Sequence, residues 1–209
     1  LTGAGLAHAT ALGVGLYTFL GLQGWLVTVG YLILGSLVTK VKMAEKERMG
    51  IAEKRGGKRG PENVWGSAAT AMVCAMGTYL LPQFAQPLRV AYVASMATKL
   101  SDTCGSEIGK AYGKTTYLIT SLKRVPPGTE GAVSLEGTLA GVAGSALIAG
   151  LGLALGVIEG VDAAVCVFAA FLATTAESYI GAVFQDKVSW LTNELVNLIM
   201  TVIGAAIAL

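Results

Sequence analysis

Charged residues are scarce in this chain. They make up 13% of its 209 residues, whereas hydrophobic residues make up 54% and the mean hydropathy is +0.64. Between Leu1 and Thr39 no charged residue occurs at all. This composition excludes an ordinary soluble globular domain and is typical of a chain that crosses a membrane several times. We therefore predict an all-α fold, a membrane helix bundle that forms a single domain over residues 1–209.

Cysteine and histidine are also few. The three cysteines, Cys74, Cys104 and Cys166, lie in separate apolar segments without the spacing of metal ligands, and His8 is isolated. Nothing in this pattern requires a disulfide, and no cluster suggests a Cys/His metal site. We interpret the cysteines as small packing residues.

Two familiar sequence signals are missing. The segment Gly109–Thr115, GKAYGKT, resembles a phosphate-binding P-loop, but only three residues separate its glycines where the motif has four, and no strand precedes it. We reject a P-loop on these grounds. No internal repeat is found either, although many membrane transporters are built from repeats around a site near the bilayer midplane.

What the chain does contain is a series of seven apolar segments. About 20 apolar residues cross a bilayer, so residues 1–39 are long enough for two helices that turn near residues 21–24. The five further spans that we predict lie at about 64–82, 87–108, 133–157, 162–184 and 191–209. Because small residues let membrane helices approach closely, we expect Gly137, Gly141 and Gly144 to form a packing face.

The positive charges are placed unevenly. Eight of the fifteen Lys and Arg residues lie between Lys40 and Arg59, four lie between Lys110 and Arg124, and Lys187 occupies the last loop. With seven spans, the basic loops at about 40–62, 109–132 and 185–191 emerge on one face, because two crossings separate each loop from the next. The positive-inside rule then assigns this face to the cytosol or its topological equivalent.

Polar residues inside the spans gather toward the same face. Asp102, Ser106 and Lys110 recur at i, i+4 and i+8, which places them on one stripe of a helix. Other predicted helices bring polar residues to this face at their ends: Asn63, Ser67 and Thr70; Ser134, Glu136 and Thr138; Thr174, Glu177, Ser178 and Gln185; Asn193, Glu194 and Asn197. Ionisable groups at membrane depth are costly and usually mark a functional site. We predict a polar cup that opens to one side.

Acids beside lysines and glycine-rich loops suit the binding of Mg²⁺ and phosphates. Mg²⁺ prefers oxygen ligands and often takes one or two protein carboxylates together with substrate phosphates. The candidate ligands are Asp102, Glu107, Glu130, Glu136 and Glu177, and the candidate phosphate contacts are Lys110, Lys114, Lys123 and Arg124. The turn Pro126–Gly131 can form a nest of backbone amides for an anion, and the loop Gly56–Asn63 is basic and flexible enough to close over phosphates.

Structural interpretations of several of these residues stay open. The charged run from Lys40 to Arg55 suits a solvated helix that sets the topology. Lys99 suits an ion pair with Asp102, and Gln185, Asn193 and Asn197 suit hydrogen bonds between helices.

Five motifs together resemble one known family. They are GIAEKRGGKRGPENVWGSA at residues 50–68, KLSDTCGSEIGKAYGK at 99–114, PPGTEGAVSLEGTLAG at 126–141, ESYIGAVFQ at 177–185 and NELVNL at 193–198. In this order they are similar to the integral-membrane phytyl-phosphate kinases of plants and their bacterial relatives. The segment from Lys123 to Gly137 also resembles, more distantly, CTP-using polyprenol kinases and phosphatidate cytidylyltransferases.

The resemblance implies a reaction and an address. The family transfers a phosphoryl group from a nucleoside triphosphate, with CTP as a candidate, to phytyl phosphate, and the phytyl diphosphate serves tocopherol (vitamin E) and phylloquinone synthesis. The implied location in plants is the chloroplast envelope. The partners that we expect are phytyl or a related prenyl phosphate, the nucleotide and membrane lipids, with no nucleic acid; oligomerisation is left open.

On this basis we expect a Mg²⁺-dependent lipid-phosphate kinase with assigned site residues. The expected metal ligands are Asp102, Glu107 and Glu136, and the catalytic set adds Lys123 and Glu130. The expected nucleotide- and phosphate-binding residues are Lys58, Arg59, Asn63, Ser106, Lys110, Lys114, Arg124, Gly128, Thr129, Gly131, Ser134, Glu177, Ser178, Gln185, Asn193 and Asn197. Two alternatives are kept: a lipid-phosphate nucleotidyltransferase, and a membrane transporter or scramblase that uses the same polar cup.

Overall fold

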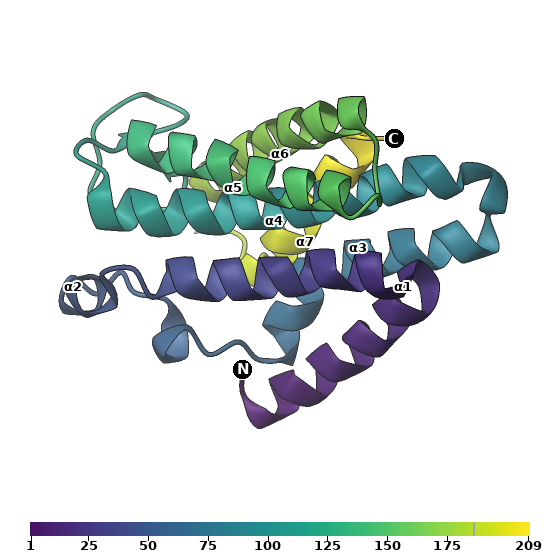
Figure 1. Ribbon diagram of the computed structural model, residues 1–209. Coiled ribbons are helices and arrows are strands. Elements are labelled where there is room, and N and C mark those ends of the chain that lie inside the picture. The colour runs from purple at the N-terminus through teal and green to yellow at the C-terminus, as the bar shows by residue number, and fades with distance from the viewer. Residues whose placement is uncertain (186) are drawn as a thin grey trace.

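The computed structural model describes residues 1–185 and 187–209, without the side chains at positions 54 and 55. Its helices are α1 (Gly3–Thr39), α2 (Met43–Arg48), α3 (Pro61–Leu80), α4 (Ala85–Tyr112), α5 (Leu135–Ala154), α6 (Gly160–Ile180) and α7 (Asn193–Ile207). Short helical turns cover Lys54–Gly57 (η1), Pro82–Phe84 (η2) and Gly181–Gln185 (η3), and the strands β1 (Tyr117–Leu118) and β2 (Ala132–Val133) form a small antiparallel ladder. The predicted all-α helix bundle is confirmed (Figure 1).

A glycine divides α1 into two arms. Gly21 has φ 67° and ψ −167°, a backbone conformation that side chains with a Cβ rarely adopt, and the chain bends sharply there (Figure 1). We call residues 3–20 the first arm and residues 22–39 the second arm. With α3 to α7, the described residues thus contain seven long helical segments, as the sequence predicts.

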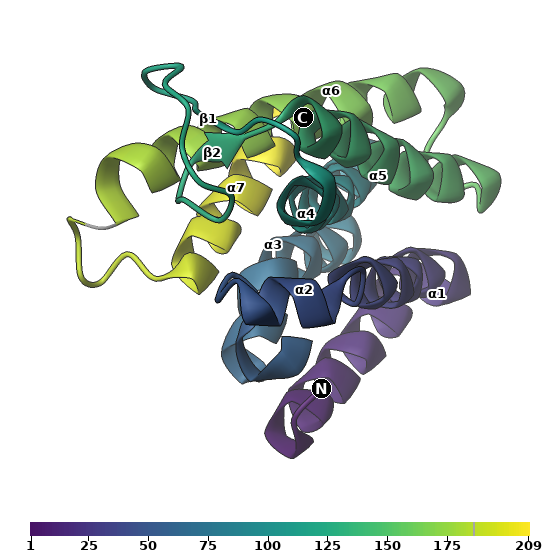
Figure 2. The same ribbon diagram turned by 90° about the vertical axis from the view of Figure 1, so that its left-hand side faces the viewer.

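Three of the described helices are long and apolar enough to cross a membrane by length and composition alone: α1, α5, and α6 together with η3. The helix α4 differs because it carries a charged stripe. It lies at the centre of the bundle, where α1, α3, α5, α6 and α7 pack around it (Figure 2). Every residue from Val90 to Ser101 is buried, so this part of the helix faces protein rather than lipid, and polar groups there can find partners.

The predicted glycine face of α5 is confirmed. A Cβ added at Gly137 would lie 2.6 Å from the carbonyl oxygen of Gly105, and one at Gly144 would lie 3.1 Å from that of Leu100. A Cβ added at Gly141 would lie 3.1 Å from both the carbonyl oxygen and Oγ of Ser101. The backbones of α4 and α5 therefore touch along this stripe, which larger residues would force apart.

The loops lie at two opposite ends of the bundle. Thr2 donates its backbone N–H to the Arg59 carbonyl at 3.0 Å, so the start of α1 lies beside the loop that precedes α3. The α2 segment and the β1–β2 connection lie at this same end, which we call the basic end (Figures 1 and 2). At the other end Gln86 donates to Asp162 at 3.2 Å and joins the starts of α4 and α6.

The secondary structure differs from the predicted loops in detail. The helix α4 continues to Tyr112, so residues 109–112 are helical, and Lys110 in its last turn complements the helix dipole. The basic loop after α1 contains the short helix α2, and the segment after α4 pairs β1 with β2. Asp186, within the loop predicted at 185–191, lies outside the described residues.

Candidate functional site

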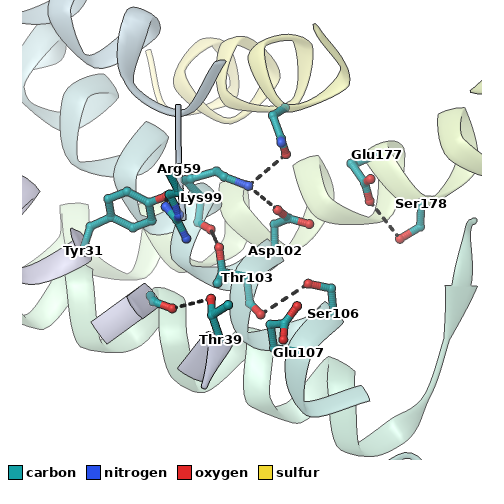
Figure 3. Close-up of polar contacts among 12 residues, drawn as sticks. Tyr31, Thr39, Arg59, Lys99, Asp102, Thr103, Ser106, Glu107, Glu177 and Ser178 are labelled. Carbon is teal, nitrogen blue, oxygen red and sulfur yellow. Dashed lines mark hydrogen bonds and ion pairs between the residues drawn. The ribbon is translucent and has the colours of Figure 1, made fainter. Parts of the chain in front are cut away.

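A polar cluster occupies the C-terminal half of α4 at the basic end (Figure 3). Lys99 lies at its centre: Nζ donates to Asp102 Oδ2 at 2.5 Å and to Asn197 Oδ1 of α7 at 2.9 Å. Lys99 is buried, and the Asp102 side chain is only 17% exposed. The ion pair with Asp102 and the interhelical bond of Asn197, which the sequence left as structural interpretations, are both present.

A second buried ion pair links α4 to the basic loop. Lys46 of α2 donates to Glu107 Oε2 and to the Thr39 carbonyl, the latter at 2.9 Å. The two charged side chains are 1% and 4% exposed, and Lys110 adds a third charge 3.6 Å from Glu107. The interpretation of residues 40–55 as a solvated run is therefore wrong at Lys46, because α2 folds back and inserts this lysine beneath the end of α4.

A cation–aromatic pair stands beside the cluster. Arg59 donates from Nη1 to the Tyr31 hydroxyl, and its guanidinium lies over the Tyr31 ring at 5.4 Å (Figure 3). Tyr31 and the more distant acids Glu53 and Asp102 raise the pKa of Arg59, so the guanidinium stays charged. Tyr31 belongs to the second arm of α1, which brings this part of α1 close to the α4 cluster.

Acids from three elements interact electrostatically at the basic end. Glu177 of α6 interacts electrostatically with Asp102 and Lys99 of α4 and with Glu130 of the β1–β2 connection. It also accepts a hydrogen bond from Ser178 at 3.3 Å. Glu177 thus interacts with Glu130, 47 positions away, and with Asp102, 75 positions away, both at the end where the sequence predicts a polar cup.

The turn that contains Glu130 is docked on α6. Gly131 has φ +71°, and a Cβ there would lie 2.4 Å from the Ser178 carbonyl oxygen. Gly128 has φ +86°, and a Cβ there would lie 2.6 Å from a methyl carbon of Ile51. Both glycines are thus required by conformation and by close contact, and the turn joins the basic loop to the end of α6.

An unpaired amide oxygen lies near this turn. Gln185 Oε1 is buried and has no hydrogen-bond partner among the described residues. Oxygens of Gln185 and Glu130 lie 3.5 and 3.8 Å from the position that a Cβ on Gly181 would take. A buried acceptor without a partner suits a hydrogen-bond donor or a cation from a ligand.

The remaining predicted residues fall into two groups. Several have structural roles: Ser134 caps α5 by accepting from Gly137 at 3.1 Å, Asn63 caps α3 and donates to Glu194 at 3.0 Å, and Ser106 bonds within α4. Others are exposed at the basic end: Lys58, Lys114, Lys123, Arg124, Gly128, Thr129 and Asn193.

The three expected metal ligands are not gathered into one cluster. Glu107 is paired with Lys46, Asp102 is paired with Lys99, and Glu136 lies half-buried in the first turn of α5. In the part of the chain that the structure describes, no three His, Cys, Asp or Glu side chains form a metal-binding group. The expectation of a metal site made by these three acids together is therefore wrong, because packing gives two of them lysine partners.

Sequence reasoning missed Lys46 and Tyr31. Nothing in a charged run distinguishes the one lysine that tertiary packing buries. For Tyr31 a signal existed: Tyr31, Gly35 and Thr39 recur at i, i+4 and i+8, and all three are buried on one face of the second arm.

Comparisons with known proteins give a consistent result. The family model described as integral membrane protein DUF92 matches residues 1–205. The chain is 55% identical over its whole length to the uncharacterized membrane protein sll0875 of Synechocystis, covering 81% of that protein. It is 49% identical over its whole length to the chloroplastic protein VTE6 of Arabidopsis thaliana, covering 64% of it, and 32% identical to the membrane protein MJ0933 of Methanocaldococcus jannaschii, covering 84%. No solved structure matches the chain.

Proposed function

The chain belongs to the integral membrane protein DUF92 family, and we propose that it is a lipid-phosphate kinase that acts on a prenyl phosphate. The acceptor that we propose is phytyl phosphate, and the donor is a nucleoside triphosphate, with CTP as the first candidate. The ordered motifs support this function, since they resemble the phytyl-phosphate kinases and match a chloroplastic plant protein across the whole chain. The same relative is chloroplastic, which supports a location in the chloroplast, and the envelope is the address that the family resemblance implies.

The observation that carries the proposal is the one-sided distribution of charge. Acids and cations from α4, α6, the basic loop and the β1–β2 connection meet at one end of the bundle, whereas the opposite end carries few charges, among them Asp162. A water-soluble nucleotide can reach this end from solvent, while a lipid reaches it through the membrane. Phosphoryl transfer requires mainly that two phosphates be positioned and that their charge be neutralised.

The proposed reaction balances without a general base. An oxygen of the acceptor phosphate is already anionic at neutral pH, and its lone pair forms the new bond to the γ-phosphorus. The bond between this phosphorus and the β–γ bridging oxygen breaks, and its electron pair leaves with the nucleoside diphosphate. The cations Lys110, Lys123 and Arg124 neutralise the phosphates from the loop side, and Lys99 fixes the Asp102 carboxylate.

The residues present fit Mg²⁺ when substrate phosphates supply part of its coordination. In our proposal Asp102 or Glu177 supplies one carboxylate and the substrate phosphates supply most of the other ligands, because no three acidic side chains of the described residues form a metal-binding group. Mg²⁺ would supply neutralisation of charge on the donor phosphates. Glu107 is left out of this set because its side chain is only 4% exposed and lies against Lys46, whereas the Asp102 side chain is 17% exposed.

The test is a defined reaction in lipid nanodiscs. Purified protein receives phytyl phosphate, Mg²⁺ and each nucleoside triphosphate in turn, and the products are identified by mass. We expect phytyl diphosphate and a nucleoside diphosphate. The variant Asp102→Asn should lose transfer by at least about 100-fold, the scale on which single electrostatic contacts act, whereas Asp162→Asn at the opposite end should keep it.

Folding of the variants is followed by thermal unfolding in the same nanodiscs. If Asp102→Asn is unstable, the double variant Lys99→Met with Asp102→Asn removes both charges of the ion pair. Transfer is then measured in a protein that has no unpaired buried charge at this position. A nucleotide-linked lipid with pyrophosphate would identify a nucleotidyltransferase instead. Nucleotide-independent movement of the lipid across proteoliposomes, without phosphate transfer, would identify a transporter or scramblase.

A further inference from the structure

An apolar groove lies between the two arms of α1 and the start of α3. Its volume is about 570 Å³, within the range of about 300–1,000 Å³ that is usual for small-molecule sites. Ala9 and Val14 of the first arm and Leu32 of the second arm are among its lining residues. The bend at Gly21 creates the groove, because it lets the first arm diverge from the bundle (Figure 1).

One end of this groove is polar. Among the described lining residues Arg59 alone is charged, and Tyr31, Asn63 and Ser67 accompany it. A guanidinium has five N–H donors in a planar fork that suits phosphate oxygens, and Nη1 of Arg59 is directed to Tyr31. The groove therefore combines a long apolar wall with a single cation at one end, which is complementary to one apolar chain that carries an anionic head.

The polar end of the groove adjoins the candidate site. A Cβ on Gly35 would lie 3.4 Å from Arg59 Nη2, 3.5 Å from the Tyr31 ring and 3.9 Å from Leu100 of α4. Arg59 also interacts electrostatically with Asp102, and Tyr31 does so with Lys99. Figure 3 shows these four side chains side by side.

We propose that this groove binds the isoprenoid chain of the acceptor lipid and that Arg59 binds the acceptor phosphate. The assignment rests on the proposed kinase function for the identity of the occupant. A bilayer phospholipid, with two acyl chains, matches the groove less well than a single-chain prenyl phosphate. The chain would lie between the arms of α1, and its phosphate would face the α4 acids, where the donor nucleotide arrives from the loops.

The first experiment measures binding without any reaction. Phytyl phosphate, added without nucleotide, should raise the thermal midpoint of the protein in detergent, because a ligand that binds only the folded state stabilises it. Phytol, which lacks the phosphate, should raise it much less. In the variant Arg59→Gln, phytyl phosphate should raise the thermal midpoint no more than phytol does.

A matched pair of substitutions tests the groove itself. Ala9→Phe places a ring inside the groove, whereas Ala7→Phe places the same ring on the exposed side of the same arm, outside the lining residues. We expect Ala9→Phe to raise the KM for phytyl phosphate by about tenfold or more and to abolish the thermal shift, with the KM for nucleotide unchanged. Ala7→Phe should behave like the wild type.

The outcomes separate this inference from the kinase proposal. An active enzyme in which Ala9→Phe leaves both the KM and the thermal shift unchanged, or in which Ala7→Phe has the same effect, would overturn the groove assignment alone. A protein that shows the thermal shift and its loss in Ala9→Phe, but transfers no phosphate, would overturn the kinase and keep the lipid site.

If Ala9→Phe does not fold, photolabelling of the wild type decides the question. A phytyl phosphate that carries a diazirine in its chain should label peptides from both arms of α1, in competition with unlabelled phytyl phosphate. Labelling confined to the α5–α6 surface, or labelling that only bilayer phospholipid displaces, would contradict the proposal.

Discussion

The buried pair of Lys46 and Glu107 yields the sharpest prediction about stability. The side chains are 1% and 4% exposed, so a single replacement leaves a charge in a site that water does not reach. Breaking a buried ion pair from one side costs about 3–5 kcal/mol of unfolding free energy. For Lys46→Met we expect a loss of about 3 kcal/mol, at the lower limit of this range, because Lys110 remains 3.6 Å from Glu107.

The reverse change and the double change complete the argument. Glu107→Gln leaves the Lys46 ammonium with the Thr39 carbonyl at 2.9 Å, and we expect a loss of about 3–5 kcal/mol. Lys46→Met with Glu107→Leu removes both charges, and replacing a buried pair by apolar residues is often neutral, so this variant should lie within about 1 kcal/mol of the wild type.

The assay is reversible unfolding in mixed micelles, followed by circular dichroism as the fraction of denaturing detergent rises. Lys42→Met is the control, since the Lys42–Glu45 pair at 3.2 Å is exposed and should contribute less than about 1 kcal/mol. If the losses of the two single variants simply add in the double variant, the two charges do not interact and the reasoning fails.

Three further predictions concern packing and the Gly-rich turn. Gly137→Val should cost about 1–3 kcal/mol by thermal unfolding, because its Cβ would lie 2.6 Å from a facing carbonyl of α4, while Gly150→Ala, with nothing within 4 Å, should cost nothing measurable. Tyr92→Phe should cost about 1–3 kcal/mol in the same assay, since the buried hydroxyl donates to an α1 carbonyl at 2.6 Å; an unchanged midpoint would refute this bond. Gly131→Ala should displace the turn from α6 and increase proteolysis of residues 113–134, and an unchanged cleavage rate would show that the turn does not depend on this contact.

Much of the fold could be predicted because its signals are local. The length of the apolar segments, the break at Gly21 and the glycine stripe of α5 all depend on residues close in sequence, and the structure contains each of them. The polar stripe on α4 is also a local signal, since residues at i, i+4 and i+8 share one face of any helix.

The partners of the polar residues could not be predicted in the same way. Asp102 and Glu107 have similar sequence surroundings, yet one is paired within α4 by Lys99 and the other is paired by a lysine 61 positions away in α2. Equally, Ser134 appeared as a phosphate contact, but its hydroxyl is a helix cap. The partner of each polar side chain depends on which elements pack together, and the residues around one position do not specify this.

By itself the sequence determined a seven-segment membrane bundle with its acids and basic loops directed to one end. Hydropathy and the helical period of apolar and polar residues are both read from windows of neighbouring residues, so they do not depend on how the helices are arranged. Only the tertiary structure decided that Lys46 is buried, that three predicted metal ligands stay apart, and that the two arms of α1 enclose a groove that ends at Arg59. These features arise between elements distant in the chain, where the free energy of each charge depends on the neighbours that packing brings to it.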